Sequence, residues 1–305
     1  MVDSGKVYSL GAEGDLVCLD AAEGHVIWKK SLTEEYDIET PIWGFTGHPL
    51  VDGDLLYCLV GGEGSVAVAF DKNTGREVWR ALSANEPGYC PPTMIEHGGK
   101  KQLLIWHPQS LNSLDPLTGE LNWSTPLKPS YGMSVTAPRK IGHRLCASGI
   151  GKVGALYGLS DDVKSEPEVL WKGTAKSAVY SANSTPFLED GMIYGTDCDL
   201  GSLMGAQLTD GERLWQTWQP TAGGDRRVGH GTAYLVKHND RYFLFSETGD
   251  LILARLSREG YDELGRFHVL EPTNDAFGRH PAFANRCVYA RNDKELVCVD
   301  LAEGN

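Results

Sequence analysis

The sequence predicts an all-β protein that folds as a β-propeller of four-stranded antiparallel blades. Three observations support this prediction: a short motif recurs along the chain, a second pair of β-prone runs precedes each copy, and no stretch keeps a helical period over a convincing length. The clearest copy runs from Gly11 to Trp28 and reads GAEGDLVCLDAAEGHVIW. It has the pattern of a strand, a turn and a second strand.

In each well-formed copy of the motif, an aspartate lies four residues before a glycine and eight before a tryptophan. The copies are Asp20, Gly24 and Trp28; Asp71, Gly75 and Trp79; and Asp115, Gly119 and Trp123. The aspartate can accept hydrogen bonds from amides inside the turn, and the glycine supplies a positive φ before the next strand. The tryptophan ring is suited to packing between neighbouring sheets. We therefore interpret all three positions as structural.

Degraded copies of the motif continue to the end of the chain. They end at Trp171, Trp215 and Phe267, so the aromatic position recurs every 44–52 residues. This period, combined with strand-like content, favours propeller blades over a solenoid of helices. We predict one domain, since modular repeats routinely exceed the usual domain size. Its repeats span approximately residues 1–32, 33–82, 83–127, 128–173, 174–218, 219–270 and 271–305.

The first and last repeats are expected to be incomplete. The chain starts at a turn, VDSG, that elsewhere joins the first two strands of a blade, and Asp300 and Gly304 match a motif whose tryptophan would fall three residues beyond Asn305. We expect three strands, five blades of four and three more strands, within an eight-bladed ring. The sequence is thus predicted to be an N-terminally shortened piece of a longer protein, which an upstream reading frame containing another such strand would support.

Composition narrows the classes of partner. The chain has 28 Lys and Arg against 41 Asp and Glu, a formal net charge of −13, which argues against nucleic acid. Its seven cysteines are scattered, without a CxxC or adjacent pair, and are expected to be buried small apolar residues and not a disulfide or zinc framework. No apolar run is long enough for a membrane span.

The segments LDAAEGHVIW, AFDKNTGREVW and LDPLTGELNW resemble the pyrroloquinoline-quinone-like (PQQ-like) β-propeller repeat. Members of that group include quinoprotein alcohol dehydrogenases and the outer-membrane assembly lipoprotein of the β-barrel assembly machinery. The resemblance covers nearly the whole chain, and the later part also looks like uncharacterised planctomycete-type PQQ-like repeat proteins. It implies a propeller fold and an exported, periplasmic type of location, but the repeat itself carries little chemistry.

For a quinoprotein, the resemblance would imply a stacking tryptophan, an adjacent-cysteine disulfide ring, a Ca²⁺ site and an aspartate base. The sequence has no adjacent cysteines and no acidic cluster with the spacing of a Ca²⁺ loop, since Asp197 and Asp199 are only two carboxylates at a strand end. We therefore expect no cofactor, and keep PQQ with Ca²⁺ only for an alternative reading as an alcohol or sugar dehydrogenase.

The loops that lead from the outer strand of one blade to the inner strand of the next gather at one mouth of a propeller channel. They carry aromatic and polar residues, which together are typical of a binding site. Plugging of the channel by the aromatics is the structural alternative. The candidate ligand-binding residues are Trp43, His48, Tyr89, Tyr131, Tyr180, Asn183, Arg227, His230, Asn274, Arg279 and His280.

Three of these candidates, His48, His230 and His280, occupy similar places in different repeats. Such histidines more often bond to the backbone than to a metal, so we predict no metal site. Signatures such as GxSxG, HExxH and a P-loop are missing, and we predict no catalytic residue.

The favoured function is a non-catalytic scaffold that binds a protein or peptide, or a small ligand, through the loops at the channel mouth or by strand addition at a blade edge. The first alternative is the quinone-dependent dehydrogenase. A second alternative is an extracytoplasmic sensor module of a larger signalling protein.

Overall fold

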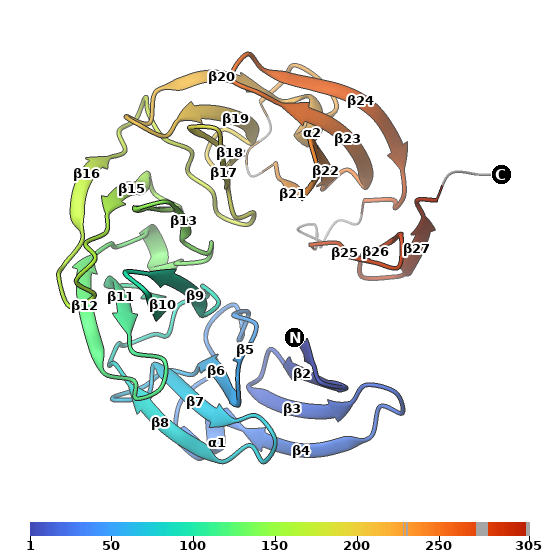
Figure 1. Ribbon diagram of the computed structural model, residues 1–305. Helices are drawn as coiled ribbons and strands as arrows, with labels where there is room; N and C mark the ends of the chain where they lie inside the picture. Colours follow the sequence, from blue (N-terminus) through green and yellow to red (C-terminus); the bar gives the residue numbers. More distant parts are fainter. Residues whose placement is uncertain (228, 230, 273–279, 303–305) are drawn as a thin grey trace. The chain divides into compact units, whose positions relative to one another are not determined.

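The computed structural model describes residues 1–227, 229, 231–272 and 280–302, and confirms the predicted all-β propeller. The strands form seven antiparallel sheets in chain order, of which six have four strands and the last has three among the described residues (Figure 1). Within each sheet, every strand pairs with the next one along the chain, so each sheet is a single blade. The chain divides into two compact units, residues 1–149 with 157–170, and residues 150–156 with 171–305.

The first unit contains three complete blades and part of a fourth. Their strands are β1 (Val2–Asp3), β2 (Lys6–Leu10), β3 (Asp15–Asp20) and β4 (Val26–Ser31); β5 (Leu50–Asp52), β6 (Leu55–Leu59), β7 (Ala67–Asp71) and β8 (Glu77–Ala81); and β9 (Thr93–His97), β10 (Lys100–His107), β11 (Ser110–Leu114) and β12 (Leu121–Pro126). A short helix α1 (Leu32–Tyr36) follows β4, and a 3₁₀ turn η1 (Ser130–Gly132) follows β12.

The boundary between the units falls inside the fourth blade, which comprises β13 (Arg139–Ile141), β14 (Arg144–Gly149), β15 (Val153–Gly158) and β16 (Glu168–Lys172). The later blades are β17 (Phe187–Glu189), β18 (Met192–Asp197), β19 (Ser202–Gln207) and β20 (Arg213–Thr217); β21 (Ala233–His238), β22 (Arg241–Ser246), β23 (Asp250–Leu256) and β24 (Tyr261–His268); and β25 (Ala282–Ala284), β26 (Cys287–Arg291) and β27 (Leu296–Asp300). Helix α2 (Gln219–Ala222) follows β20.

The repeated Asp and Gly close the turn between the third and fourth strands. Asp20 Oδ1 accepts hydrogen bonds from the amides of Ala22 and Glu23 at 2.9 and 2.8 Å, and Gly24 has a φ of 75°. The turns at Asp71 and Asp115 have the same bonds. A carboxylate that accepts two amides holds the turn in one conformation.

The repeated tryptophans lie on the outer strands and reach the turn of the next blade. The indole Nε1 donates to a backbone carbonyl in that turn: Trp28 to Lys72 at 3.1 Å, Trp79 to Pro116 at 3.0 Å, Trp171 to Leu208 at 3.0 Å and Trp215 to Ser257 at 2.9 Å. A Cβ on Gly119 would lie 2.5 Å from the Trp79 ring. The motif glycine therefore gives space to the tryptophan of the preceding blade, as well as its positive φ.

One junction departs from this rule. Trp123 Nε1 donates to Gln102 Oε1 of its own blade at 3.3 Å. The facing turn of the fourth blade, residues 159–167, reads LSDDVKSEP and lacks the Asp and Gly spacing.

Apolar layers between adjacent blades make up the core. Between the first two blades, Tyr8, Leu16, Leu56 and Phe70 are buried together. In three blades a second-strand tyrosine packs against the tryptophan of the same blade: Tyr8 with Trp28, Tyr57 with Trp79 and Tyr194 with Trp215. Each of these three tryptophans thus contacts its own blade and the next one.

Two expectations need correction. The first blade has four strands and not three, because Val2 and Asp3 pair with Val7 and Lys6 across a tight turn. The cysteines are all unpaired, and all seven lie in the described residues, but Cys298 is exposed and Cys287 is half-buried. Both lie in the last sheet, where Cys298 occupies the outermost described strand.

Prolines lie directly before the innermost strands of several blades. Pro49, Pro138, Pro186 and Pro281 each immediately precede the first strand of a blade, namely β5, β13, β17 and β25. A proline at that position removes no hydrogen bond from the ladder.

Candidate functional site

Three interblade loops of the first unit pack on one another. We use this name for the segments that connect successive blades, here residues 37–49, 82–92 and 127–138. The amide of Tyr89 donates to the carbonyl of Ser134 at 2.8 Å, and the backbone of Gly47 lies against that of Tyr89 and Cys90. The first loop is also fixed to the β2–β3 turn, because the amide of Phe45 donates to Ala12 O at 2.9 Å. The three loops therefore form one continuous surface.

This surface presents large apolar side chains to solvent. Ile42 is 82%, Trp43 61% and Tyr131 85% exposed. Tyr131 has a φ of 59°, which is costly for a non-glycine residue and is found preferentially at functional sites. Tyr89, predicted from the sequence as a ligand-binding residue, is instead buried beneath the loops, where burial raises its pKa and the Trp43 backbone acts in the opposite direction.

A groove of about 520 Å³ lies at this surface, where Ile42 lines it and a Cβ on Gly132, the neighbour of Tyr131, would lie 3.2 Å from Glu86 of its lining. One wall is Ile38 to Ile42, the floor is Val60 to Gly62 at the end of β6, and the other wall is Asn85 to Pro87. Added Cβ atoms at Gly61 and Gly62 would contact Pro87 at 3.3 Å and Ile38 at 2.9 Å, so the two glycines allow both walls to approach the floor. The lining is mixed: Glu39 and Glu86 add negative charge beside Thr40, Asn85 and the apolar residues.

The candidates of the second unit lie in different environments. Tyr180 is buried, its hydroxyl donates to Thr174 O at 2.6 Å, and Asn183 is half-buried. Arg227 Nη2 donates to Asp199 O at 2.7 Å. His280 is exposed and its Nδ1 lies 3.0 Å from Pro281 O, while His48 in the first unit has the equivalent contact with Pro49 O at 3.3 Å.

His230, Asn274 and Arg279 lie outside the described residues. Their predicted role in ligand binding therefore stays a prediction.

A buried ion pair lies beneath Tyr180. Asp197, at the end of β18, accepts from Arg213 Nη2 at 3.3 Å and from the amides of Leu200 and Tyr180 at 3.0 and 3.3 Å. Burial raises the pKa of Asp197 against the opposing effect of these three donors. Arg213 also donates from Nε to Ala178 O at 2.7 Å. The pair is therefore part of the packing of this blade.

Glu247, in the β22–β23 turn, is a half-buried carboxylate with a raised pKa. Burial raises its pKa to about 7, although hydrogen bonds from Thr232 favour the charged form. Its Oε1 has no hydrogen-bond partner among the described residues. At neutral pH this side chain is consequently divided between its protonated and ionised forms.

Replacing Glu247 with glutamine is expected to flatten the pH dependence of stability. Because the folded-state pKa is raised, the contribution of Glu247 is fully present below its unfolded pKa and is lost as pH rises through about 7. Above pH 7, Glu247→Gln should be more stable than the wild type by about 2 kcal/mol. Urea unfolding at pH 5 and pH 8 measures this, with Glu259→Gln, an exposed glutamate of the next turn, as the control. Equal pH profiles for wild type and Glu247→Gln would contradict it.

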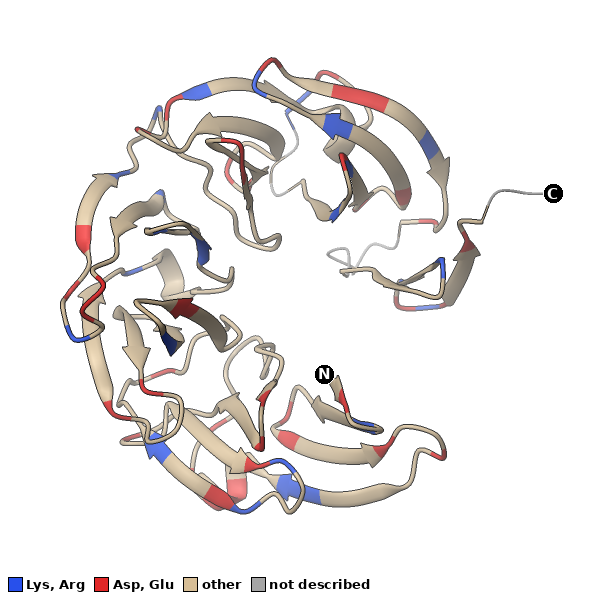
Figure 2. Ribbon diagram, in the orientation of Figure 1, with Lys and Arg blue, Asp and Glu red and all other residues tan. Residues whose placement is uncertain are grey.

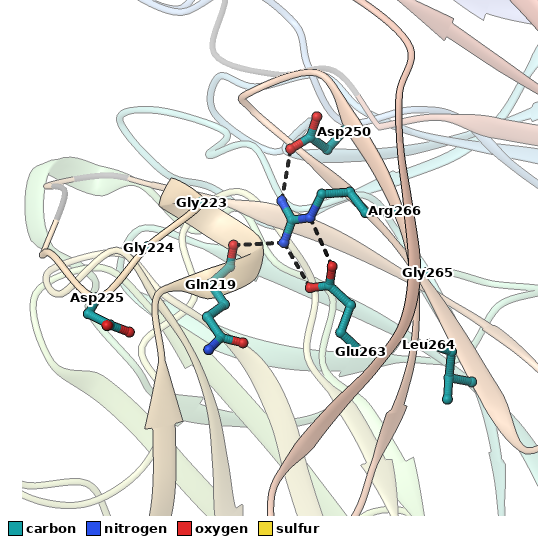
Figure 3. Close-up of a pocket in the computed structure, with 9 residues that line it drawn as sticks. All are labelled: Gln219, Gly223, Gly224, Asp225, Asp250, Glu263, Leu264, Gly265 and Arg266. Carbon is teal, nitrogen blue, oxygen red and sulfur yellow. Dashed lines mark hydrogen bonds and ion pairs between the residues drawn. The ribbon is translucent and has the colours of Figure 1, made fainter.

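A second hollow, of about 680 Å³, lies near α2 and β24 (Figure 3). Its arginine, Arg266, is already engaged: it donates to both oxygens of Glu263 at 3.0 and 2.8 Å, to Asp250 Oδ2 at 2.8 Å and to Gln219 O at 3.0 Å. Asp250 also contacts His268 at 2.8 Å, and that hydrogen bond raises the pKa of His268. We interpret the residues around this hollow as a structural hydrogen-bond network, because Arg266 is already bonded and is not available to an anionic ligand.

Comparison with known proteins gives the family. The family model described as outer membrane protein assembly factor BamB matches residues 1–217 and 164–305. This chain belongs to the BamB family.

Similar proteins agree with that assignment. BamB from Yersinia pestis is 24% identical over 263 residues, which cover 81% of this chain and 63% of the relative. A lanthanide-dependent methanol dehydrogenase from Methylacidiphilum fumariolicum is 37% identical over only 84 residues, 26% of this chain and 13% of that protein. The chain thus spans less than two thirds of the length of these curated relatives.

Solved structures support the same fold. The crystal structure of BamB from Moraxella catarrhalis aligns with a TM-score of 0.68 at 18% identity, covering 97% of this chain and 81% of that one. The computationally designed Ika8 protein aligns with a TM-score of 0.55 at 11% identity, covering 98% and 94%. Among the described residues of this BamB-family chain, neither helix is long and apolar enough to cross a membrane.

The residues that the sequence offered for a quinone site have other contacts in the structure. The repeated tryptophans of this BamB-family chain are engaged with blade turns on the outer strands, and none of the seven cysteines is disulfide-bonded. Asp197 is held by Arg213 and two amides, while Asp199 contributes its backbone carbonyl to Arg227. These residues supply neither the disulfide ring nor the stacking indole that the dehydrogenase alternative requires.

Sequence reasoning did not find the groove or Glu247. The groove combines residues from three separate segments, and Glu39 and Glu86 read as ordinary loop charges. The adjacent apolar residues of PIWGF, residues 41–45, were the available signal, because Ile42 and Trp43 are consecutive large apolar residues in a segment otherwise typical of a loop.

Proposed function

We propose that this chain is a non-catalytic scaffold of an outer-membrane protein assembly system, and that it binds a protein partner through the interblade loops of its first unit. The supporting observation is the exposure of Ile42, Trp43 and Tyr131 beside the groove. Tryptophan and tyrosine are enriched at the centres of protein interfaces, where they contribute most of the binding energy.

The chemistry of the groove indicates the kind of segment that it accepts. Ile38, Pro41 and Ile42 offer accessible apolar surface, and Glu39 and Glu86 offer negative charge. The chain as a whole carries a formal charge of −13, with acidic and basic residues interspersed over the blades (Figure 2). The expected ligand is therefore a peptide segment or loop that carries an apolar anchor next to a lysine or arginine.

The proposal includes an exported location facing the outer membrane. Its support is membership of a family named for outer-membrane protein assembly. A scaffold in this location needs only a stable recognition surface, which the packed loops and blades provide.

Site-specific photocrosslinking tests this function. A photoreactive phenylalanine analogue at position 131 should crosslink, in the native cells, to a protein of the outer-membrane assembly system. The same analogue at position 117 should not, since Leu117 is 73% exposed in the same unit but lies on an outer turn, between β11 and β12. Crosslinking of the same proteins from both positions, or of no assembly protein from position 131, would contradict the proposal.

A further inference from the structure

Three potential metal-ligating side chains meet between the third and fourth blades, within the first unit. His97 is the last residue of β9, His143 lies in the β13–β14 turn and Asp161 lies in the β15–β16 loop. One ligand atom from each lies within 4.8 Å of the others. The group is separate from the groove described above.

His97 has a buried imidazole with an unsatisfied nitrogen. Its side chain is 4% exposed, and its Nε2 has no hydrogen-bond partner among the described residues. A buried imidazole nitrogen without a partner is unfavourable, because it has lost its hydrogen bonds to water. This nitrogen lies toward Asp161, with 3.7 Å between Nε2 and Oδ1.

The distances fit a shared cation better than direct hydrogen bonds. His143 Nδ1 lies 3.8 Å from the same Oδ1 of Asp161, and the two imidazole rings are perpendicular with centroids 5.1 Å apart. Both nitrogen-to-oxygen separations exceed the 3.2 Å upper range of a hydrogen bond. Two ligands of a tetrahedral zinc lie about 3.3 Å apart, so each of these two separations would shorten by about half an ångström on binding, and the two imidazole nitrogens, which are within 4.8 Å of each other, would also have to approach.

The backbone holds the three elements together independently of any ion. The amide of Leu159 donates to His143 O at 2.8 Å, which ties the β15–β16 loop to the β13–β14 turn. A Cβ on Gly98 would lie 2.4 Å from Asp161 O, so the β9–β10 turn contacts that loop directly. The neighbouring carboxylate, Asp162, is used within the loop, where it accepts from the amide of Lys164. The donor set is therefore positioned before metal binds.

We propose that His97, His143 and Asp161 bind a divalent transition metal ion of the zinc class. Two imidazoles and one carboxylate form a donor set that zinc prefers, and the exposed side of His143 and Asp161 leaves a fourth position for water. The ion would join the third blade to the fourth. This is the junction at which Trp123 bonds within its own blade and not to the next turn.

Calorimetric titration of the full chain with Zn²⁺ tests the site. We expect one ion per chain, with affinity reduced in His143→Ala and in Asp161→Asn by more than the roughly 10–100-fold that loss of an outer-shell partner costs. Both side chains are largely exposed, so these variants should fold. His25→Ala is the matched control, because His25 is exposed and lies 3.5 Å from Glu23, and no third ligand joins them among the residues that the structure describes.

Thermal unfolding supplies a second readout. Zn²⁺ should raise the melting temperature of the wild type and of His25→Ala, and should have little effect on His143→Ala or Asp161→Asn. His97→Gln should behave like the other ligand variants. Absence of Zn²⁺ binding by the wild type, or binding that persists unchanged in both His143→Ala and Asp161→Asn, would overturn the proposal.

Discussion

Replacing Trp79 with alanine is expected to lower the free energy of unfolding by about 3–5 kcal/mol. The indole is 8% exposed, packs on Tyr57 with ring centroids 5.9 Å apart, and donates to Pro116 O in the next blade. Its loss leaves a cavity and removes the contact between two blades. Chemical denaturation measures the effect, with Val78→Ala, an exposed position of the same strand, as the control.

Gly119, in the turn that Trp79 contacts, provides a second test of this contact. Gly119→Ala places a Cβ 2.5 Å from the Trp79 ring at a φ of 74°, so it should destabilise through both the contact and the backbone. In the Trp79→Ala background only the backbone strain remains. The double variant should therefore be more stable than the sum of the two single effects predicts. Strictly additive effects would show that the side chains at positions 79 and 119 do not interact.

Replacing Arg213 with methionine should destabilise the protein by about 3–5 kcal/mol at neutral pH. The change leaves Asp197 buried and charged, with only the amides of Leu200 and Tyr180 as donors. Because burial already raises the pKa of Asp197, protonation of its carboxylate should relieve part of the loss as the pH falls below neutrality. Urea unfolding at several pH values measures both effects.

Two further variants control for this interpretation. Arg255 has exposed ion pairs with Asp240 and Asp262 at 3.7 and 3.9 Å, so Arg255→Met should cost at most about 1 kcal/mol. Adding Asp197→Asn to Arg213→Met removes the buried charge and should recover part of the stability at pH 7. A loss in Arg213→Met that is independent of pH, or no recovery in the double variant, would argue against an uncompensated buried carboxylate.

The fold could be predicted because its signals are local. Asp20, Gly24 and Trp28 are read within one turn and one strand, and the same geometry recurs in the next copies. The period of the repeat then gives the number of blades. The first strand, Val2–Asp3, was missed because two residues are too few to show a strand pattern, and only their pairing with Val7 and Lys6 reveals them.

The site could be predicted only in part, since exposure depends on contacts between distant loops. Trp43 and Tyr131 belong to the predicted set and are exposed, whereas Tyr89 is covered by the loop at Ser134. The metal-ligating group was not predicted. His97, His143 and Asp161 come from three turns in two blades, so no spacing along the sequence signals them.

The central claim is that the interblade loops of the first unit bind a protein partner. Its most direct measurement is the affinity of the assembly protein captured by the crosslink at position 131 for the wild type, for the Trp43→Ser/Tyr131→Ser double variant and for a Leu117→Ser control. All three replaced side chains are exposed, so folding should be preserved. We predict that the double variant binds about 100-fold more weakly and that the control binds like the wild type. Equal affinity of the wild type and the double variant would contradict the account.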